Sequence, residues 1–324
     1  MPKRTALLFA AALLTLGGGC GDRAVDPLLV RIGHFQSVTH AHGLVAHAAT
    51  RAGKGWFEPR LGEGMRVEWS VYPAGPSAVE ALLAGAVDAV YVGPNPALNA
   101  YVRSKGREVR VLAGATRGGS ALVVQGDGRI KTPADFKGKR VATPQLGNTQ
   151  DVACRRWLKA NGLRTTIGGG DVVLSQPAYA DQLALFTTGG LDAAWIVEPW
   201  VSRLEKEAGG KVFFEEKDAL TAVLVGSAAF VSGRKETASR LVEAHAELTT
   251  WLREHAPEAL ETARGELREE TRVALSPEIL SRAWGRLRFD DAVSRADFEG
   301  FVAAARDVGF LDEDVALDRL VVAK

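Results

Sequence analysis

The sequence of 324 residues is long enough for two domains or one large one. Its hydrophobic content of 46% and charged content of 24% are typical of a globular protein, and a net charge of +1 argues against a broad basic surface for nucleic acid. The two cysteines, Cys20 and Cys154, form no Cys-x-x-Cys motif, which argues against a disulfide framework or a thiolate zinc site.

The N-terminus has the pattern of an export signal rather than of a folded element. Lys3 and Arg4 precede an apolar run over residues 6–16 that is too short to span a bilayer. Three glycines and Cys20 follow and resemble the processing site of bacterial lipoproteins, with the expected leucine displaced by one position to Leu16. We therefore expect lipidation at Cys20, with plain secretion by nearby cleavage as the alternative. Either places the mature protein outside the cytoplasm, in the periplasm or at the cell surface.

Strand and helix patterns alternate in the first part of the mature chain. Apolar runs predict strands at 28–35, 65–72, 87–92 and 109–115, and helical patterns begin near residues 43, 77 and 97. Ser77 and Glu80 have the spacing of a capping box at the start of one of these helices. Such alternation is typical of a mostly parallel sheet covered by helices.

A second alternating region follows the small residues at 114–120, which we interpret as a crossover. Strands are predicted at 121–125, 140–143, 171–174, 191–197 and 211–214. The apolar run at 221–231 is predicted as a return strand, and helices are predicted to start near residues 235, 257, 276 and 294. The expected division is a signal peptide at 1–20, a tether at 21–27, lobe 1 at 28–115, lobe 2 at 116–222 and a return segment of lobe 1 at 223–324.

The stretch 139–162 predicts a strand, a polar loop and a helix in turn. Gly147 favours a turn, and Asn148 is a candidate helix N-cap with Asp151 three residues further on. Free backbone N–H groups and the helix dipole make such a loop suited to an anion. We interpret the loop 145–150 as holding one end of a small ligand; the alternative is an ordinary capped junction between strand and helix.

A short internal repeat indicates two lobes of similar build. Leu-Ala-Gly-Ala-Val-Asp88, an apolar run and Pro94 are similar to Thr-Thr-Gly-Gly-Leu-Asp192, an apolar run and Pro199. The repeat is too short to prove a duplication. Ligands of parallel sheets bind in the crevice at the carboxyl ends of the strands, so two facing lobes would direct both sets of loops into one cleft.

Four segments, in this order along the chain, resemble one protein family. They are Thr-Pro-Gln-Leu-Gly-Asn-Thr-Gln-Asp-Val at 143–152, Gln-Leu-Ala-Leu-Phe at 182–186, Leu-Asp-Ala-Ala-Trp-Ile-Val-Glu-Pro-Trp at 191–200 and Glu-Ala-Gly-Gly-Lys-Val at 207–212. From about residue 28 to 310 the chain resembles the extracytoplasmic substrate-binding proteins of ABC importers of the sulfonate, taurine and nitrate type. The resemblance implies an α/β, two-lobed periplasmic-binding-protein type II fold, with a ligand cleft between the lobes and a helical C-terminal region packed on lobe 1.

The resemblance also implies a role and partners. Such proteins capture a small-molecule ligand and deliver it to a membrane permease with its ATPase, without catalysis and without a cofactor. We therefore expect a lipid-anchored monomer that binds a small anionic or zwitterionic solute, with an organic sulfonate favoured over nitrate, bicarbonate or phosphonate. The alternatives are a sensor component and an enzyme similar to thiamine-pyrimidine synthase. The export signal and the lack of a cysteine-rich iron motif argue against that enzyme.

Ligand contacts in this family come from the first loop of each strand–helix unit. Carried onto this chain, the candidates are Gln36, Thr39, His40, Gly75, Ser77, Asn95, Arg117, Gly147, Asn148 and Thr149, together with Trp195, Glu198 and Trp200. Several have a structural alternative, with Ser77 as a helix cap, Arg117 as a surface residue and Trp195 as a core residue. Glu198 is suited to accept a hydrogen bond from an amino-bearing ligand.

Four histidines, His34, His40, His42 and His47, lie close together in the sequence. Imidazole is a common metal ligand, but a site requires three ligands from different elements with supporting hydrogen bonds. We expect no metal and interpret His40 or His42 as a hydrogen-bond donor to an anion. The alternative for both is a capping or rim position.

Overall fold

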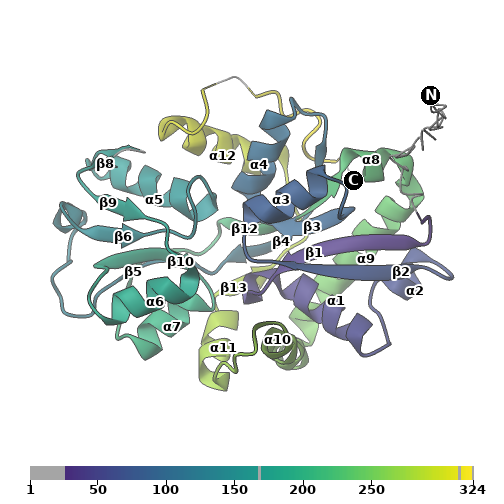
Figure 1. Ribbon diagram of the computed structural model, residues 1–324, viewed down its shortest axis with the longest axis horizontal. Coiled ribbons are helices and arrows are strands. Elements are labelled where there is room, and N and C mark those ends of the chain that lie inside the picture. Colours follow the sequence, from purple (N-terminus) through teal and green to yellow (C-terminus); the bar gives the residue numbers. More distant parts are fainter. Residues whose placement is uncertain (1–25, 167–168, 313–314, 323–324) are drawn as a thin grey trace, which may run out of the picture.

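The computed structural model describes residues 26–166, 169–312 and 315–322. They form an α/β fold of two lobes, each built on its own sheet (Figure 1). The expected signal peptide, the lipidation at Cys20 and most of the tether lie outside the described residues. Within the described part of the chain, no helix has both the length and the apolar character of a membrane span.

Lobe 1 is organised on a six-stranded sheet in the order β13-β4-β12-β3-β1-β2. Its strands are β1 (Leu29–Phe35), β2 (Arg66–Tyr72), β3 (Ala89–Val92), β4 (Val109–Gly118), β12 (Leu220–Ser227) and β13 (Leu287–Phe289). β1 pairs in parallel with β2 and β3, whereas β12 is antiparallel to β3 and β4. All of β3 is buried, because helices cover both faces of this sheet.

Two apolar clusters form the core of lobe 1, one on each face of the sheet. The first joins the sheet to α1 (Ala41–Arg51), α2 (Glu58–Leu61), α9 (Lys235–Glu254), α10 (Ala256–Thr271) and α11 (Pro277–Trp284). The second joins it to α3 (Gly75–Leu83), α4 (Pro94–Arg103) and α12 (Arg295–Asp307). Leu44 and Leu248 are fully buried in the first cluster, and Leu98 and Phe298 in the second. The chain that returns from lobe 2 thus completes the core begun by the first hundred residues.

Lobe 2 has a five-stranded sheet in the order β11-β5-β10-β6-β9. Its strands are β5 (Ser120–Val124), β6 (Arg140–Ala142), β9 (Val173–Ser175), β10 (Ala193–Val197) and β11 (Lys211–Glu216). A two-stranded ribbon of β7 (Thr165–Thr166) and β8 (Gly169–Gly170) accompanies the sheet, and its helices are α5 (Thr149–Ala160), α6 (Tyr179–Thr187) and α7 (Trp200–Glu207). β6, β9 and β10 are parallel, so their carboxyl ends meet on the side that faces lobe 1.

The chain crosses between the lobes at two places. β4 leads into β5 through Gly119, and β11 leads into β12 through residues 217–219. The domain boundaries expected after residues 115 and 222 therefore fall within β4 and β12. The C-terminal helices pack on lobe 1, while α11 and α12 also contact α7 and α5 of lobe 2 (Figure 1).

The internal repeat makes the same hydrogen bonds in both lobes. Asp88 accepts from the backbone N–H of Arg31 at 2.8 Å and from its guanidinium at 2.7 Å. Asp192 accepts from the backbone N–H of Arg140 at 2.9 Å and from its guanidinium at 3.1 Å. Each aspartate therefore fastens a buried strand, β3 or β10, to its parallel neighbour.

The start of α3 differs from the prediction. α3 begins at Gly75 with Ala74 as its N-cap, and the Ser77 hydroxyl donates to the Ala74 carbonyl oxygen over 2.9 Å. Ser77 and Glu80 therefore do not form the expected capping box. Two other helix starts follow the sequence signal, because Asn148 caps α5 and Ser294 caps α12 through their side chains.

The apolar run at 221–231 is not one strand. β12 ends at Ser227, whose hydroxyl accepts from the backbone N–H of Phe230 and so caps α8 (Ala228–Gly233). The apolar pattern continues from β12 into α8 because residues of both elements belong to the same core. β13 was not predicted, since a three-residue strand is too short to show a period.

Candidate functional site

A cleft of about 500 Å³ lies between the lobes, at the carboxyl ends of strands from both sheets. Phe35 and Tyr72 end β1 and β2 on the lobe 1 side, and Val197 ends β10 on the lobe 2 side. Ligands of parallel α/β sheets bind at this edge, and the volume is in the range of small-molecule pockets. Position and size therefore make this cleft the candidate ligand site.

Helix N-termini from both lobes line the cleft. Gly75 begins α3, Thr149 begins α5, Tyr179 begins α6 and Trp200 begins α7, and all four residues border the cavity. The positive ends of the helix dipoles are thus directed at the space between the lobes. Among the described residues, no aspartate, glutamate, lysine or arginine lines it. Attraction for an anion therefore comes from backbone dipoles rather than from charged side chains.

The loop before α5 is held by a buried carboxylate. Asp151 accepts hydrogen bonds from the Thr143 hydroxyl at 2.8 Å, the Gly147 N–H at 2.9 Å and the Arg155 guanidinium at 3.0 Å. The Asn148 side chain accepts from the Asp151 N–H at 2.9 Å, which confirms it as the N-cap. Because its carboxylate is fully occupied beneath the loop, Asp151 does not oppose an anion in the cleft. In a capping box the Asp151 carboxylate would accept from the backbone N–H of Asn148, whereas here it accepts from that of Gly147.

Two buried polar atoms at the cleft have no partner among the described residues. They are Nε2 of His40 and Oε1 of Gln145, and both residues line the cavity. Nδ1 of His40 lies 3.2 Å from the Thr39 hydroxyl, so only the other ring nitrogen is available. A buried polar atom without a partner costs about 1–3 kcal/mol. An anionic ligand in the cleft would accept from Nε2 of His40, whereas Oε1 of Gln145 only accepts and needs a donor group on the ligand.

His40 is electrically neutral at physiological pH. Its burial, and to a lesser extent the nearby His34, lower its pKa to about 3. In the unfolded chain the same imidazole has its ordinary pKa of about 6.5. Neutral imidazole can donate one hydrogen bond to an anion without placing a full charge in the cleft.

The lowered pKa predicts a loss of stability in mild acid. As the pH falls from 7 to 5, the unfolded chain gains a proton at His40 and the folded chain does not, so the free energy of unfolding falls by about 2 kcal/mol from this residue. Buried His42, with a pKa also lowered chiefly by burial, acts in the same direction. Urea unfolding at both pH values should show a smaller decrease in His40→Gln than in the wild type. An unchanged decrease would contradict the assignment.

Aromatic rings line the cleft from both lobes, and the stacked pair on the lobe 2 side forms an apolar wall. Tyr179 and Trp200 stack with ring centroids 5.5 Å apart and an interplanar angle of 8°, and both line the cavity. Phe35 and Tyr72 lie on the lobe 1 side. This wall suits the apolar part of a ligand whose polar end lies at the helix N-termini.

The structure brings part of the expected contact set together. The expected residues that line the cleft are Gln36, Thr39, His40, Gly75, Asn148, Thr149 and Trp200. The Gln36 amide donates to the Glu270 carbonyl oxygen at 3.0 Å, which orients it at the rim. Gly147 does not line the cleft; it provides the turn before α5 with a φ of 71°, and its N–H binds Asp151.

Ser77 and Glu198 do not line the cleft. The Ser77 hydroxyl is bonded to its own helix start, as described above. The Glu198 carboxylate is buried, accepts from the Ser202 hydroxyl at 2.9 Å and pairs with Arg286 at 2.8 Å. Its backbone oxygen accepts from the Ser37 hydroxyl at 2.8 Å, so Glu198 joins the lobes rather than offering its side chain to a ligand.

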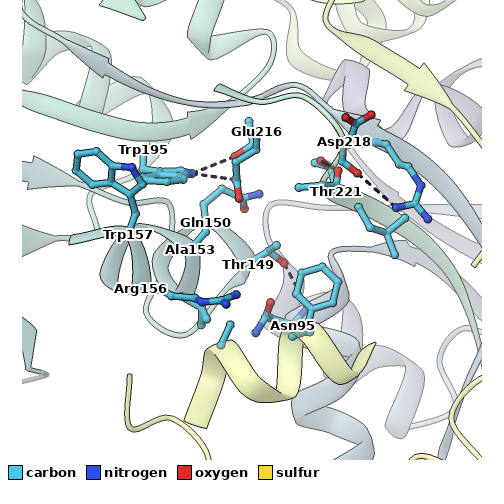
Figure 2. Close-up of a pocket in the computed structure, with 18 of the residues that line it drawn as sticks. Asn95, Thr149, Gln150, Ala153, Arg156, Trp157, Trp195, Glu216, Asp218 and Thr221 are labelled. Carbon is cyan, nitrogen blue, oxygen red and sulfur yellow. Dashed lines mark hydrogen bonds between the residues drawn. The ribbon is translucent and has the colours of Figure 1, made fainter. Parts of the chain in front are cut away.

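Asn95, Arg117 and Trp195 line a second cavity of about 460 Å³, shown in Figure 2. Arg117 pairs there with Asp290 at 3.2 Å and Asp297 at 3.0 Å, so its charge is already balanced. The Trp195 indole donates to Ser120 and Glu216. The Asn95 N–H donates to the Thr149 hydroxyl at 3.3 Å, a contact between the lobes, and Thr149 lines both cavities.

Several cleft residues were not named individually as ligand contacts, although two of them lie in the loop 145–150 that the sequence predicts to hold the ligand. They are Ser37, Gln145, Gln150, Gln176, Tyr179, Thr221 and Thr271. Gln145 and Gln150 belong to the predicted loop 145–150, and Gln176 follows the end of β9, where the rule of strand ends could have found it. Thr271 ends α10, which belongs to the segment that returns to lobe 1 after lobe 2. No local sequence pattern indicates that the end of this helix reaches the cleft.

Of the clustered histidines, only His40 reaches the cleft. His42 is buried behind it, with Nε2 2.9 Å from the Thr249 hydroxyl and its ring stacked on His245. His34 and His47 meet at Glu270 and do not line the cavity.

Residues 24–264 match the sequence model of the NMT1-like family. The taurine-binding periplasmic protein of Escherichia coli is 31% identical over 157 residues, covering 48% of this chain and 45% of that protein, so the chain spans about half the length of this curated relative.

The alkanesulfonate-binding protein from Xanthomonas axonopodis pv. citri, bound to MOPS, superposes with a TM-score of 0.74 at 20% identity, covering 92% of this chain and 99% of that one. The periplasmic nitrate-binding protein from Synechocystis PCC 6803 superposes with a TM-score of 0.75 at 16% identity, covering 91% and 86%. The chain therefore belongs to the NMT1-like family and has the two-lobed α/β fold of the substrate-binding proteins of ABC importers.

Proposed function

We propose that the protein captures a small organic anion, best represented by an organic sulfonate, in the cleft between its lobes and delivers it to an ABC importer. In this proposal it works as a monomer outside the cytoplasm, held to the membrane by a lipid on Cys20. The role requires binding and release but no chemical step. The observation that carries it is the cleft itself, with helix N-termini from both lobes and Nε2 of His40 as a buried donor that has no partner among the described residues.

The properties of the cleft favour a sulfonate over other anions. A sulfonate group carries one charge over three acceptor oxygens, which suits several weak neutral donors better than a cationic clamp. The stacked Tyr179 and Trp200 offer an apolar wall that nitrate or bicarbonate would leave unused. A polyanion would require arginine or lysine, and none lines the described cleft. The relatives named for taurine and for alkanesulfonates are consistent with this choice.

A thermal-shift panel tests the proposal. It would contain alkanesulfonates, taurine, nitrate, bicarbonate and phosphonates, each added to the purified protein. A ligand at about 100 times its Kd stabilises by roughly 2.7 kcal/mol, which for a chain of this size raises the Tm by several degrees. We expect that rise with a sulfonate. No rise with any compound would contradict the proposal.

Arg117→Ala and Asn148→Ala serve as a matched pair for the responding compound. Asn148 borders the cleft, so its loss should weaken binding, whereas Arg117 is paired with aspartates around the other cavity. Arg117→Ala should therefore leave the Kd of the ligand within about twofold of the wild-type value, whatever it does to the Tm. A larger loss of affinity in Arg117→Ala would move the site to the second cavity.

A further inference from the structure

Three potential metal ligands from distant parts of the chain meet beside the cleft. They are Nε2 of His34 on β1, Nδ1 of His47 on α1 and Oε1 of Glu270 on α10. The three atoms form a triangle, because each lies 3.1 Å from both others. Glu270 lies 223 residues after His47, so only the fold brings them together. The side chains of His34 and Glu270 are 0% and 2% exposed.

Hydrogen bonding between neutral imidazoles and the Glu270 carboxylate would leave this triangle unsatisfied. Nδ1 of His34 lies 3.1 Å from the Phe35 carbonyl oxygen, which requires a proton on that nitrogen and leaves a lone pair on Nε2. That lone pair faces the Glu270 carboxylate, which also only accepts. The one proton on Nδ1 of neutral His47 cannot serve both neighbours. The second carboxylate oxygen of Glu270 is buried and has no partner among the described residues.

A cation placed between the three atoms resolves the conflict. Zinc binds imidazole nitrogen and carboxylate oxygen at about 2.0–2.2 Å, so neighbouring ligands of a tetrahedral site lie about 3.3–3.5 Å apart. The observed separations of 3.1 Å require only a slight expansion. We propose that His34, His47 and Glu270 bind a divalent transition metal ion, with Zn²⁺ as the best match to two imidazoles and one carboxylate.

The surroundings of the triangle support this assignment. The bond from His34 to the Phe35 carbonyl fixes the ring so that Nε2 is the ligand, which is the usual support for a metal-bound histidine. Trp69 packs against both imidazoles with centroid distances of 5.5 Å and closes one side. Gly43 leaves the space that His34 occupies, since a Cβ there would lie 2.5 Å from the His34 side chain.

Two further charged groups face His47. Oε1 of Glu266 lies 3.1 Å from Nδ1 of His47 and pairs with Arg51 at 2.7 Å. The guanidinium of Arg51 also lies 3.3 Å from Nε2 of His47. Metal binding through Nδ1 requires the proton of His47 on Nε2, which lies beside the Arg51 guanidinium. Because Arg51 is half exposed, its guanidinium can turn away from Nε2 and keep Glu266 as its partner. Glu266 is then placed to accept from a metal-bound water or to become a fourth ligand.

The site lies directly behind the cleft. Gln36, at the cleft rim, donates to the backbone oxygen of Glu270, and the next residue, Thr271, lines the cavity. A metal held by Glu270 would fix the last turn of α10 to β1 and α1. The ion therefore acts as a structural support for one wall of the cleft and does not contact the ligand.

Titration calorimetry with ZnCl₂ tests the proposal on untagged, EDTA-treated protein. We expect one Zn²⁺ per chain, and His47→Gln and Glu270→Gln should each weaken binding by at least about 100-fold, since loss of a ligand exceeds the 10- to 100-fold effect of a supporting group. His255→Ala, which removes an exposed histidine on another surface, should bind as the wild type does. Zn²⁺ should also raise the Tm of the wild type by several degrees and leave both cluster variants unchanged.

Two results would overturn the proposal. Equal Zn²⁺ affinity in the wild type and both cluster variants would place the ion elsewhere. The second result is no Zn²⁺ binding by the wild type, together with an NMR titration that shows His34 protonated on both nitrogens at neutral pH. It would show that a proton on His34, rather than a metal ion, holds the three side chains together. Neither result bears on the sulfonate proposal, because the panel of anions does not depend on these side chains.

Discussion

Replacing Asp151 by alanine is expected to lower the free energy of unfolding by about 3–5 kcal/mol. The Asp151 carboxylate is fully buried and is the ion-pair partner of Arg155, whose side chain is 3% exposed. Without the carboxylate, the Arg155 charge remains buried, and among the described residues only the Thr166 carbonyl oxygen is left as its hydrogen-bond acceptor. The Thr143 hydroxyl and the Gly147 N–H lose their acceptor at the same time. The loop before α5 should therefore loosen, and ligand affinity should fall together with stability.

Urea unfolding of a small set of variants checks this result. Asp151→Asn keeps the shape and one acceptor and should cost less than Asp151→Ala. The double variant Asp151→Ala/Arg155→Met removes the unpaired charge and should recover part of the loss, which gives the coupling energy of the pair. A cost below about 1 kcal/mol for Asp151→Ala would show that the pair is not buried as described.

Introducing a negative charge at Gln145 is expected to abolish anion capture. Gln145 lines the neutral cleft beside the start of α5, and its side-chain oxygen has no partner in the described part of the chain. A like charge about 4 Å from the ligand costs about 4 kcal/mol at an effective dielectric constant of 20, and water screens part of this. Gln145→Glu should therefore weaken binding of the responding sulfonate by about 100-fold or more.

Gln145→Ala is the matched control for that charge. It removes one hydrogen bond without adding a charge and should weaken binding by about tenfold. Both variants should unfold within about 0.5 kcal/mol of the wild type, because Gln145 makes no side-chain bond within the described protein. If Gln145→Glu bound the ligand as well as Gln145→Ala does, or more tightly than the wild type, the ligand would not be an anion.

The parts of the fold that follow local rules were predictable. Ala89–Val92 and Ala193–Val197 are continuous apolar runs, and both are fully buried central strands. The aspartates before them, Asp88 and Asp192, marked the repeat that the structure shows as two equivalent pairs with arginine. The N-cap at Asn148 followed from its spacing to Asp151 alone.

Properties that depend on distant partners were not predictable. Arg117 has the appearance of a free cation in a cleft loop, and its partners Asp290 and Asp297 arrive from the end of the chain. Glu270 likewise joins His34 and His47 through a helix whose own pattern shows only an amphipathic surface. For His34, the sequence itself carried a signal. It follows Val30 and Ile32 at every second position of β1, so the alternation places this histidine on the buried face, where an apolar residue is expected.

The neutral lining of the cleft also affects how fast a solute arrives. A cleft lined by lysine or arginine draws anions from a distance, and this steering weakens as salt is added. Helix dipoles act only within about one turn of the helix end, and the whole chain carries a net charge of only +1. If the protein captures a solute as proposed, the rate of capture should therefore be that of diffusion without electrostatic steering. We expect that rate to be nearly the same at low and at high salt concentration.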